Sequence, residues 1–146
     1  MKNLLFIACI SLLVIGCEED KTTYDPVPEI GIVSVSPVVA NEFQDDITVV
    51  LSYIDGDGDL GENDPNVNNL FITDNRINIT QAFRIPQLSP SGSEIALQGQ
   101  LDVIIPGTGI TDGSNQQQAT FTLYVKDRAG NESNRVTTQF ITIKKP

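Results

Sequence analysis

An acidic, glycine-rich segment at residues 53–65 carries the residue types best suited to do chemistry in this sequence. Asp55, Asp57 and Asp59 alternate with glycines. The glycines allow the backbone to curl, so that several carboxylates can be aimed at one point. Ca²⁺ takes about six to eight oxygen ligands, whereas without a cation such carboxylates repel one another. The segment therefore predicts a calcium site, with a solvated acidic turn as the alternative.

The start of this segment resembles the Asp-x-Asp-x-Asp calcium loops of the EF-hand and dockerin type. The resemblance then ends, because Leu60 occupies the usual glycine position and Asn66 stands where those loops carry a twelfth-position Glu. No helical pattern flanks the loop, so only the preference for the ion carries over. Mg²⁺ is disfavoured because it demands a tighter, near-ideal cage than a flexible glycine-rich loop offers.

Short β-branched segments with a period of two surround the acidic loop and must position it. We expect strands at residues 32–36, 47–53, 70–73, 77–79, 95–105, 121–125 and 136–143. In the fifth of these, Ile95 is expected to face the core and Gly99 to mark a kink or bulge, and the last strand is expected to change phase near Phe140. Residues 87–93 and 107–118 read as polar loops. About seven strands predict an all-β, antiparallel Greek-key sandwich of the immunoglobulin-like kind, with a jelly roll as the alternative.

Residues 121–133, from Phe121 through Asp127-Arg-Ala-Gly-Asn131-Glu-Ser, resemble the F–G hairpin of bacterial immunoglobulin-like and fibronectin-type repeats. The chain departs from antibody-type domains in lacking the paired cysteines and the tryptophan of the core. In such a sandwich the B–C and F–G loops share one end, so Asp127 and Asn131 are expected to face the Asp55–Asp59 carboxylates and to coordinate or brace the ion. A plain tight turn is the alternative for both residues.

The N-terminus predicts export and lipid attachment. Residues 4–15 form an apolar run too short to span a bilayer, after a positive Met-Lys-Asn start. The run ends Val-Ile-Gly-Cys17, which resembles the bacterial lipobox. This resemblance implies cleavage before Cys17 and lipid, including palmitate, on its thiol. An ordinary core cysteine or an unlipidated export signal is the alternative.

Three regions follow from this: a signal peptide at 1–16, a lipidated cysteine with an extended tether at 17–29, and the sandwich domain at 30–146. Glu18, Glu19 and Asp20 behind the cysteine resemble the surface-export signal of Bacteroidetes lipoproteins. We therefore expect an outer-membrane lipoprotein displayed on the cell surface, with a periplasm-facing protein as the alternative. The tether would reach the domain at the same end as the acidic loop.

Composition narrows the function. The formal net charge of −10 argues against a nucleic-acid partner. The absence of His removes the commonest general base, and the carboxylates lie mostly in loops. We expect a non-catalytic, calcium-stabilised surface module for binding, adhesion or support of an envelope complex, with an unknown protein or glycan partner. The alternatives are an accessory ligand-binding lipoprotein of a nutrient-uptake system and, least favoured, a small hydrolase.

Overall fold

The computed structural model describes residues 24–90 and 92–146, and every regular element in this part of the chain is a strand. The strands are β1 (Glu29–Ser36), β2 (Val39–Asn41), β3 (Ile47–Asp55), β4 (Leu70–Asp74), β5 (Ile79–Phe83), β6 (Leu97–Ile105), β7 (Gln116–Ala119), β8 (Phe121–Val125), β9 (Val136–Thr137) and β10 (Ile141–Lys144). A helix long and apolar enough to cross a membrane is absent from these described residues. The predicted signal peptide and Cys17 lie outside them.

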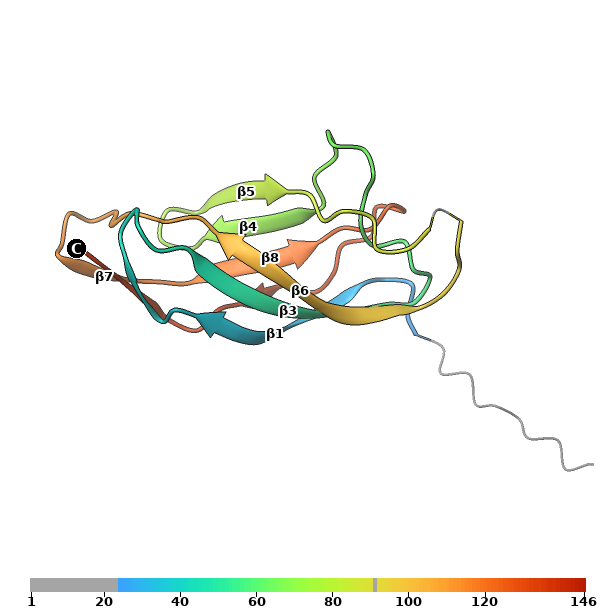
Figure 1. Cartoon of the computed structure of the whole chain (residues 1–146), viewed down its shortest axis with the longest axis horizontal. Helices are drawn as coiled ribbons and strands as arrows, with labels where there is room; N and C mark the ends of the chain where they lie inside the picture. Colours follow the sequence, from blue (N-terminus) through green and yellow to red (C-terminus); the bar gives the residue numbers. More distant parts are fainter. Residues whose placement is uncertain (1–23, 91) are drawn as a thin grey trace, which may run out of the picture.

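The strands form two facing layers (Figure 1). One layer is the antiparallel sheet β1-β3-β6, and the other contains the antiparallel sheet β5-β4-β8-β9. The short sheet β2-β10-β7 extends the second layer, because β7 and β8 are separated only by Thr120, and residues 138–140 alone separate β9 from β10. At this junction the Thr138 hydroxyl accepts a hydrogen bond from the Phe121 amide.

This strand order confirms the predicted immunoglobulin-like Greek-key sandwich. β1, β3 and β6 occupy the places of strands A, B and E, and β4, β8 and β9 occupy those of C, F and G. The loop after β3 is therefore the B–C loop and the turn after β8 is the F–G loop. Both loops lie at the same end of the sandwich, as the sequence predicts.

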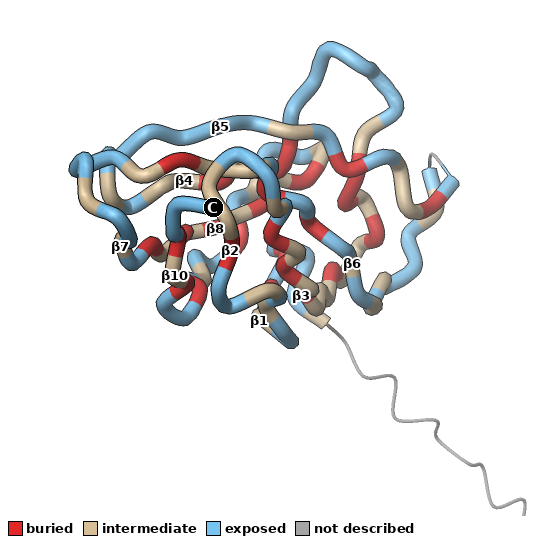
Figure 2. The backbone as a smooth tube through the Cα atoms, turned by 60° about the vertical axis from the view of Figure 1, so that its left-hand side comes forward, coloured by how far each residue is buried: buried red, intermediate tan, exposed pale blue. Residues whose placement is uncertain are grey.

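The core lies between the layers and follows the period-two pattern of the strands (Figure 2). On β3, the side chains of Ile47, Val49 and Leu51 are completely buried, and on β8 those of Leu123 and Val125 are. Alternate residues of a strand point to opposite faces, so each strand contributes one apolar row to the interior.

Three local expectations are wrong. Residues 77 and 78 belong to a turn, with Asn78 at a φ of 55°, and β5 begins at Ile79. Ile95 precedes β6 and is 58% exposed, so it does not face the core. Gly99 makes no bulge, because it pairs in register with Tyr53, whose hydroxyl would lie 2.7 Å from a Cβ at that position. This glycine makes room for the tyrosine ring.

The last strand is interrupted as predicted: Phe140 is exposed in the gap, whereas Ile141 and Ile143 are completely buried. Two strands are not predicted from the sequence. β2 is short and pairs in parallel with β10, while β7 lies inside the segment expected to be a polar loop. β7 is built mainly of glutamines, so it lacks the apolar alternation on which strand prediction depends.

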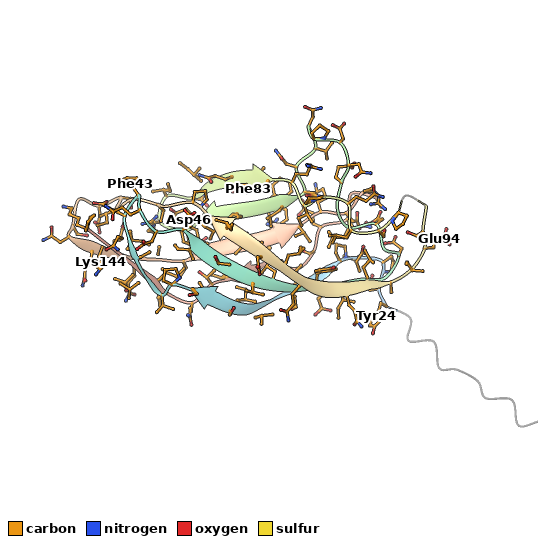
Figure 3. The ribbon with its side chains drawn as sticks, in the orientation of Figure 1. Tyr24, Phe43, Asp46, Phe83, Glu94 and Lys144 are labelled. Carbon is orange, nitrogen blue, oxygen red and sulfur yellow. The ribbon has the colours of Figure 1, made fainter. Side chains whose placement is uncertain are left out.

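The N-terminal side of the domain begins before the predicted boundary at residue 30. β1 already starts at Glu29, and the preceding Pro28 is fully buried. Tyr24 lies at one end of the sandwich, the end that also carries Glu94, whereas Phe43 and Lys144 lie at the other (Figure 3). The described chain thus begins at the end of the sandwich that holds the acidic loop.

Candidate metal centre

Asp55, Asp59 and Asp127 form a cluster of carboxylates at this end of the sandwich. Each offers one oxygen atom, and these atoms all lie within 4.8 Å of one another. Asp55 is the last residue of β3, Asp59 lies in the loop that follows, and Asp127 lies in the turn after β8. The structure therefore brings the predicted B–C and F–G residues together.

Three buried carboxylate oxygens in the acidic loop have no hydrogen-bond partner in the described structure. They are the Oδ1 atoms of Asp55, Asp57 and Asp59. The Asp55 side chain is completely buried. A buried charged oxygen without a partner is costly, and native proteins satisfy such groups with a donor, a water or a metal ion. A water, a proton or a metal ion could satisfy these oxygens.

The electrostatics of the cluster point the same way. Burial raises the pKa of Asp55 from 3.8 to about 6; a hydrogen bond from the Leu60 amide opposes this shift, and the charges of Asp57 and Asp59 add to it. Burial also raises the pKa of Asp59, together with the charges of Asp127 and Asp57. Desolvation and like charge both disfavour the ionised form. A bound cation would remove both penalties.

Backbone amides fix the carboxylates in place. The Leu60 amide donates to Asp55 Oδ2 at 2.7 Å, and the Ala129 amide donates to Asp59 Oδ2 at 2.9 Å. In both residues the second oxygen, Oδ1, is left without a partner. One oxygen of each carboxylate is thus held by the protein, and the other remains available as a ligand atom.

Asn131 braces the cluster through Asp127. Its backbone amide donates to Asp127 Oδ1 at 2.7 Å, and its side-chain amide donates to Asp127 Oδ2 at 2.8 Å. Of the two roles predicted for Asn131, its hydrogen bonds match the bracing one. Asp57 lies outside the closest group of three but contributes an unpartnered oxygen from the same loop.

The cluster depends on residues that the sequence alone does not identify. Leu60, which breaks the resemblance to EF-hand loops, is a completely buried core residue. Gly61, at a φ of 93°, makes the sharp turn that the usual glycine position makes in EF-hand loops. The Arg128 guanidinium donates to the Gly61 carbonyl at 3.1 Å. The Ser89 hydroxyl donates to the Gly58 carbonyl. Gly58 and Gly61 both have a positive φ. Of this arrangement, the sequence could have suggested only these two turns, because glycine in an acidic segment is the residue that such turns favour.

The donor set suits a hard cation. All of the nearby ligand atoms are carboxylate oxygens, which Ca²⁺ and Mg²⁺ prefer and which transition metals that favour nitrogen or sulfur do not. The unpartnered Oδ1 atoms are shielded from solvent. These shielded oxygens can hold an ion, and an open hollow lined by Asp57, Asp59 and Arg128 lies beside them.

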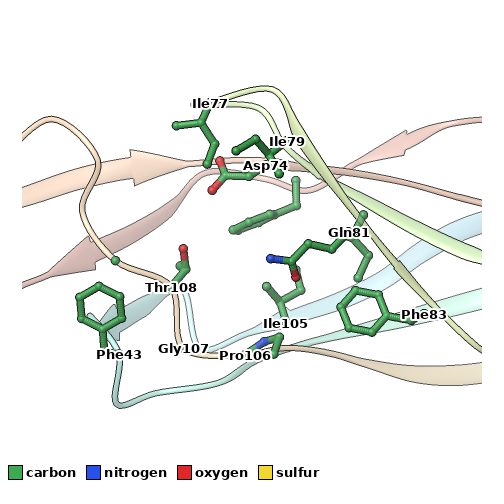
Figure 4. A pocket seen from close by; sticks show the side chains of 13 residues that line it. Phe43, Asp74, Ile77, Ile79, Gln81, Phe83, Ile105, Pro106, Gly107 and Thr108 are labelled. Carbon is green, nitrogen blue, oxygen red and sulfur yellow. The ribbon is translucent and has the colours of Figure 1, made fainter.

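A hollow of about 310 Å³ opens at the opposite end of the sandwich (Figure 4). Its walls include Phe43, Ile79, Phe83 and Ile105, and the Gln81 side chain points into it. Phe43 is 75% exposed and has a φ of 57°, a strained backbone for a bulky residue.

Asp74, the single acidic residue among the described lining of this hollow, forms an ion pair of 2.6 Å with Arg76. Both side chains of that pair are largely buried. A carboxylate held in this way is not free to act as an acid or a base. The hollow is therefore lined by both apolar and polar groups, without a free carboxylate among its described lining.

Comparison with known proteins gives little further assignment. No family model matches the chain, and no curated protein matches it. A crystal structure of a mutant of the SrpA adhesin from Streptococcus sanguinis is similar at 21% identity and a TM-score of 0.36. The match covers 85% of this chain and 60% of the adhesin chain. The fold and the site themselves define the class: an immunoglobulin-like β-sandwich with a buried carboxylate cluster between its B–C and F–G loops.

Proposed function

We propose that this chain is a non-catalytic, lipid-anchored module of the bacterial envelope, displayed at the outer membrane and stabilised by calcium. Its role is binding, adhesion or the support of an envelope complex. The observation that carries the calcium part is the set of shielded, unpartnered Oδ1 atoms of Asp55, Asp57 and Asp59 beside Asp127. They match the oxygen ligands of a hard cation and have no other partner among the described residues.

The bound ion is structural. The carboxylate at its centre, Asp55, is completely buried, and the pKa shift of Asp55 is accounted for by burial and neighbouring acids. At a free ion concentration about a hundredfold above Kd, the ion stabilises the folded state by about 2.7 kcal/mol. That is a large share of the roughly 5–15 kcal/mol that holds a typical domain together.

Lipid attachment is proposed at Cys17, on the strength of the lipobox resemblance. The described chain begins at Tyr24, so few residues separate the lipid from the sandwich. The proposed display on the cell surface rests on the acidic residues that follow Cys17. In this proposed arrangement, the metal centre would lie near the membrane and the hollow beside Phe43 would lie at the outward end.

The hollow favours a second candidate function, that of an accessory ligand-binding lipoprotein in a nutrient-uptake system. Strained, exposed Phe43 lines the hollow and the Gln81 side chain points into it, and strained backbone of this kind clusters at binding sites. A ligand for it would have both apolar and polar parts, because the lining carries both. Loss of binding of such a ligand in the Gln81→Arg variant, with unchanged thermal stability, would favour this candidate over a purely supporting role.

The calcium proposal is tested by thermal unfolding of the purified chain in EDTA and in millimolar Ca²⁺. For a domain of this size a stabilisation of about 2.7 kcal/mol raises Tm by about 10 °C. Mg²⁺ at the same concentration serves as the control and should give a smaller shift. Coincident curves in EDTA and Ca²⁺ would overturn the calcium proposal.

A further inference from the structure

The main chain of the N-terminal arm, residues 24–28, lies directly against the acidic loop. The Gly56 amide donates to the Asp25 carbonyl at 2.9 Å. A Cβ at position 56 would lie 2.4 Å from the carbonyl oxygens of both Tyr24 and Asp25. Such a contact is far below any normal separation, so the arm can occupy this place only because residue 56 is glycine.

Two further attachments hold the arm to the domain. The first is Pro28, which is fully buried, whereas the Val27 amide donates to Asp25 Oδ1 at 2.8 Å within the arm itself. At the start of β1, the Asn134 side chain accepts a hydrogen bond from the Ile30 amide and donates to the Ile30 carbonyl, each at 2.8 Å. These contacts fix the end of the arm that joins β1, whereas the Gly56 contact fixes the end nearer Cys17.

Gly56 stands between Asp55 and Asp57, so the residue that holds the arm is part of the proposed cation loop. Without a cation, the unpartnered oxygens of these two acids favour an opened loop. Opening would move the peptide that carries the Gly56 amide. The arm and the cation therefore depend on the same loop conformation.

We propose that cation binding and docking of the arm at residues 24–28 are coupled, so that the cation holds the arm against the acidic loop. This inference rests on the calcium site of the proposed function. Coupling is reciprocal: the factor by which the ion strengthens docking of the arm equals the factor by which the docked arm raises the affinity for the ion. In the absence of the ion, residues 24–28 are released from the acidic loop.

The test is hydrogen exchange of the full chain in detergent, followed by mass spectrometry, with and without Ca²⁺, together with calorimetric titration with CaCl₂. In the parent chain, Ca²⁺ should slow exchange at Gly56 and over residues 24–30 by about tenfold or more, and exchange in β10 should not change. In Gly56→Ala, the arm should stay unprotected, and Ca²⁺ affinity should fall by a factor of about 5 to 150, the usual range of such coupling.

Asn134→Ala supplies a second variant, because it weakens the arm at Ile30 without touching the acidic loop and should lower Ca²⁺ affinity in the same direction. Asn115→Ala is the matched control, since that asparagine is exposed and its carbonyl accepts a hydrogen bond from Lys145 at the far end of the sandwich. Equal arm protection with and without Ca²⁺, or unchanged affinity in both variants, would overturn the coupling and leave the calcium site standing. Absence of Ca²⁺ binding by the parent chain would overturn both proposals.

Discussion

Asp55 and Asp127 lie far apart in the sequence, yet their carboxylate oxygens approach to within 4.8 Å. Asp55 ends β3 in one layer, and Asp127 follows β8 in the other. The two layers are held together by the buried rows of both strands, so the carboxylates cannot separate without loss of core packing. A repulsive pair is thus fixed at one end of the sandwich, and a bound cation would turn it into a stabilising contact.

Asp55→Asn should remove most of the calcium affinity, because the most deeply buried ligand loses its charge. We expect at least a hundredfold weaker binding in calorimetric titration. In EDTA at pH 7, the variant should be as stable as the parent or more stable, since the Asn carbonyl oxygen can still accept the Leu60 hydrogen bond while the buried charge is gone. Asp102→Asn, at an exposed position on β6, is the control. A strong loss of stability in EDTA would contradict this account.

The stability of the metal-free protein should fall as pH rises through the window from about 4 to 6. The pKa of Asp55 rises on folding from 3.8 to about 6, so the folded state binds more protons than the unfolded state within this window. Stability then decreases with pH, by up to about 3 kcal/mol for this one group. Denaturant unfolding of the parent and of Asp55→Asn in EDTA isolates the contribution as the difference between the two chains.

Saturating Ca²⁺ should reverse that trend, because protons compete with the ion for the same oxygens. Stability in millimolar Ca²⁺ is therefore expected to rise between pH 4 and 7. A parallel pH profile in EDTA and in Ca²⁺ would show that Asp55 is not a ligand.

Asn131→Ala should weaken calcium binding without abolishing it. The side-chain amide that braces Asp127 Oδ2 is lost, while the backbone hydrogen bond to Oδ1 remains. Loss of such a supporting contact usually costs about 10- to 100-fold in affinity. Asn115→Ala, an exposed asparagine at the opposite end, should bind Ca²⁺ as the parent does. An equal effect of both variants would argue against a specific bracing role.

Cys17→Ser should abolish lipid attachment, because a hydroxyl is a far weaker nucleophile than the thiol that the lipobox presents. Labelled palmitate should be incorporated into the parent chain and not into the variant, which should leave the membrane fraction. Cys9→Ser is the matched control, since that residue lies in the predicted signal peptide. Labelling of Cys17→Ser would place the lipid elsewhere.

The sandwich was largely predictable because alternation of apolar residues is a local signal. β3 and β8 show it, and the strands predicted at residues 47–53 and 121–125 lie within the observed bounds. The glutamines of β7 carry no such signal, and Ile95 carries a false one, since an apolar residue before a strand looks the same as one inside it. The order of the strands in the sheets cannot be predicted from this local alternation, because pairing depends on partners that are remote in the chain.

For the metal centre, the sequence by itself determined the acidic residues, the glycines between them and the expectation that Asp127 would join them. Only the tertiary structure decided that Leu60 is buried in the core, that Asn131 contacts Asp127, and that the arm at Asp25 rests on Gly56. The physical reason is that residue type and spacing set what a segment can bind. Which oxygen is left without a partner depends on burial and on neighbours that only the folded chain brings together.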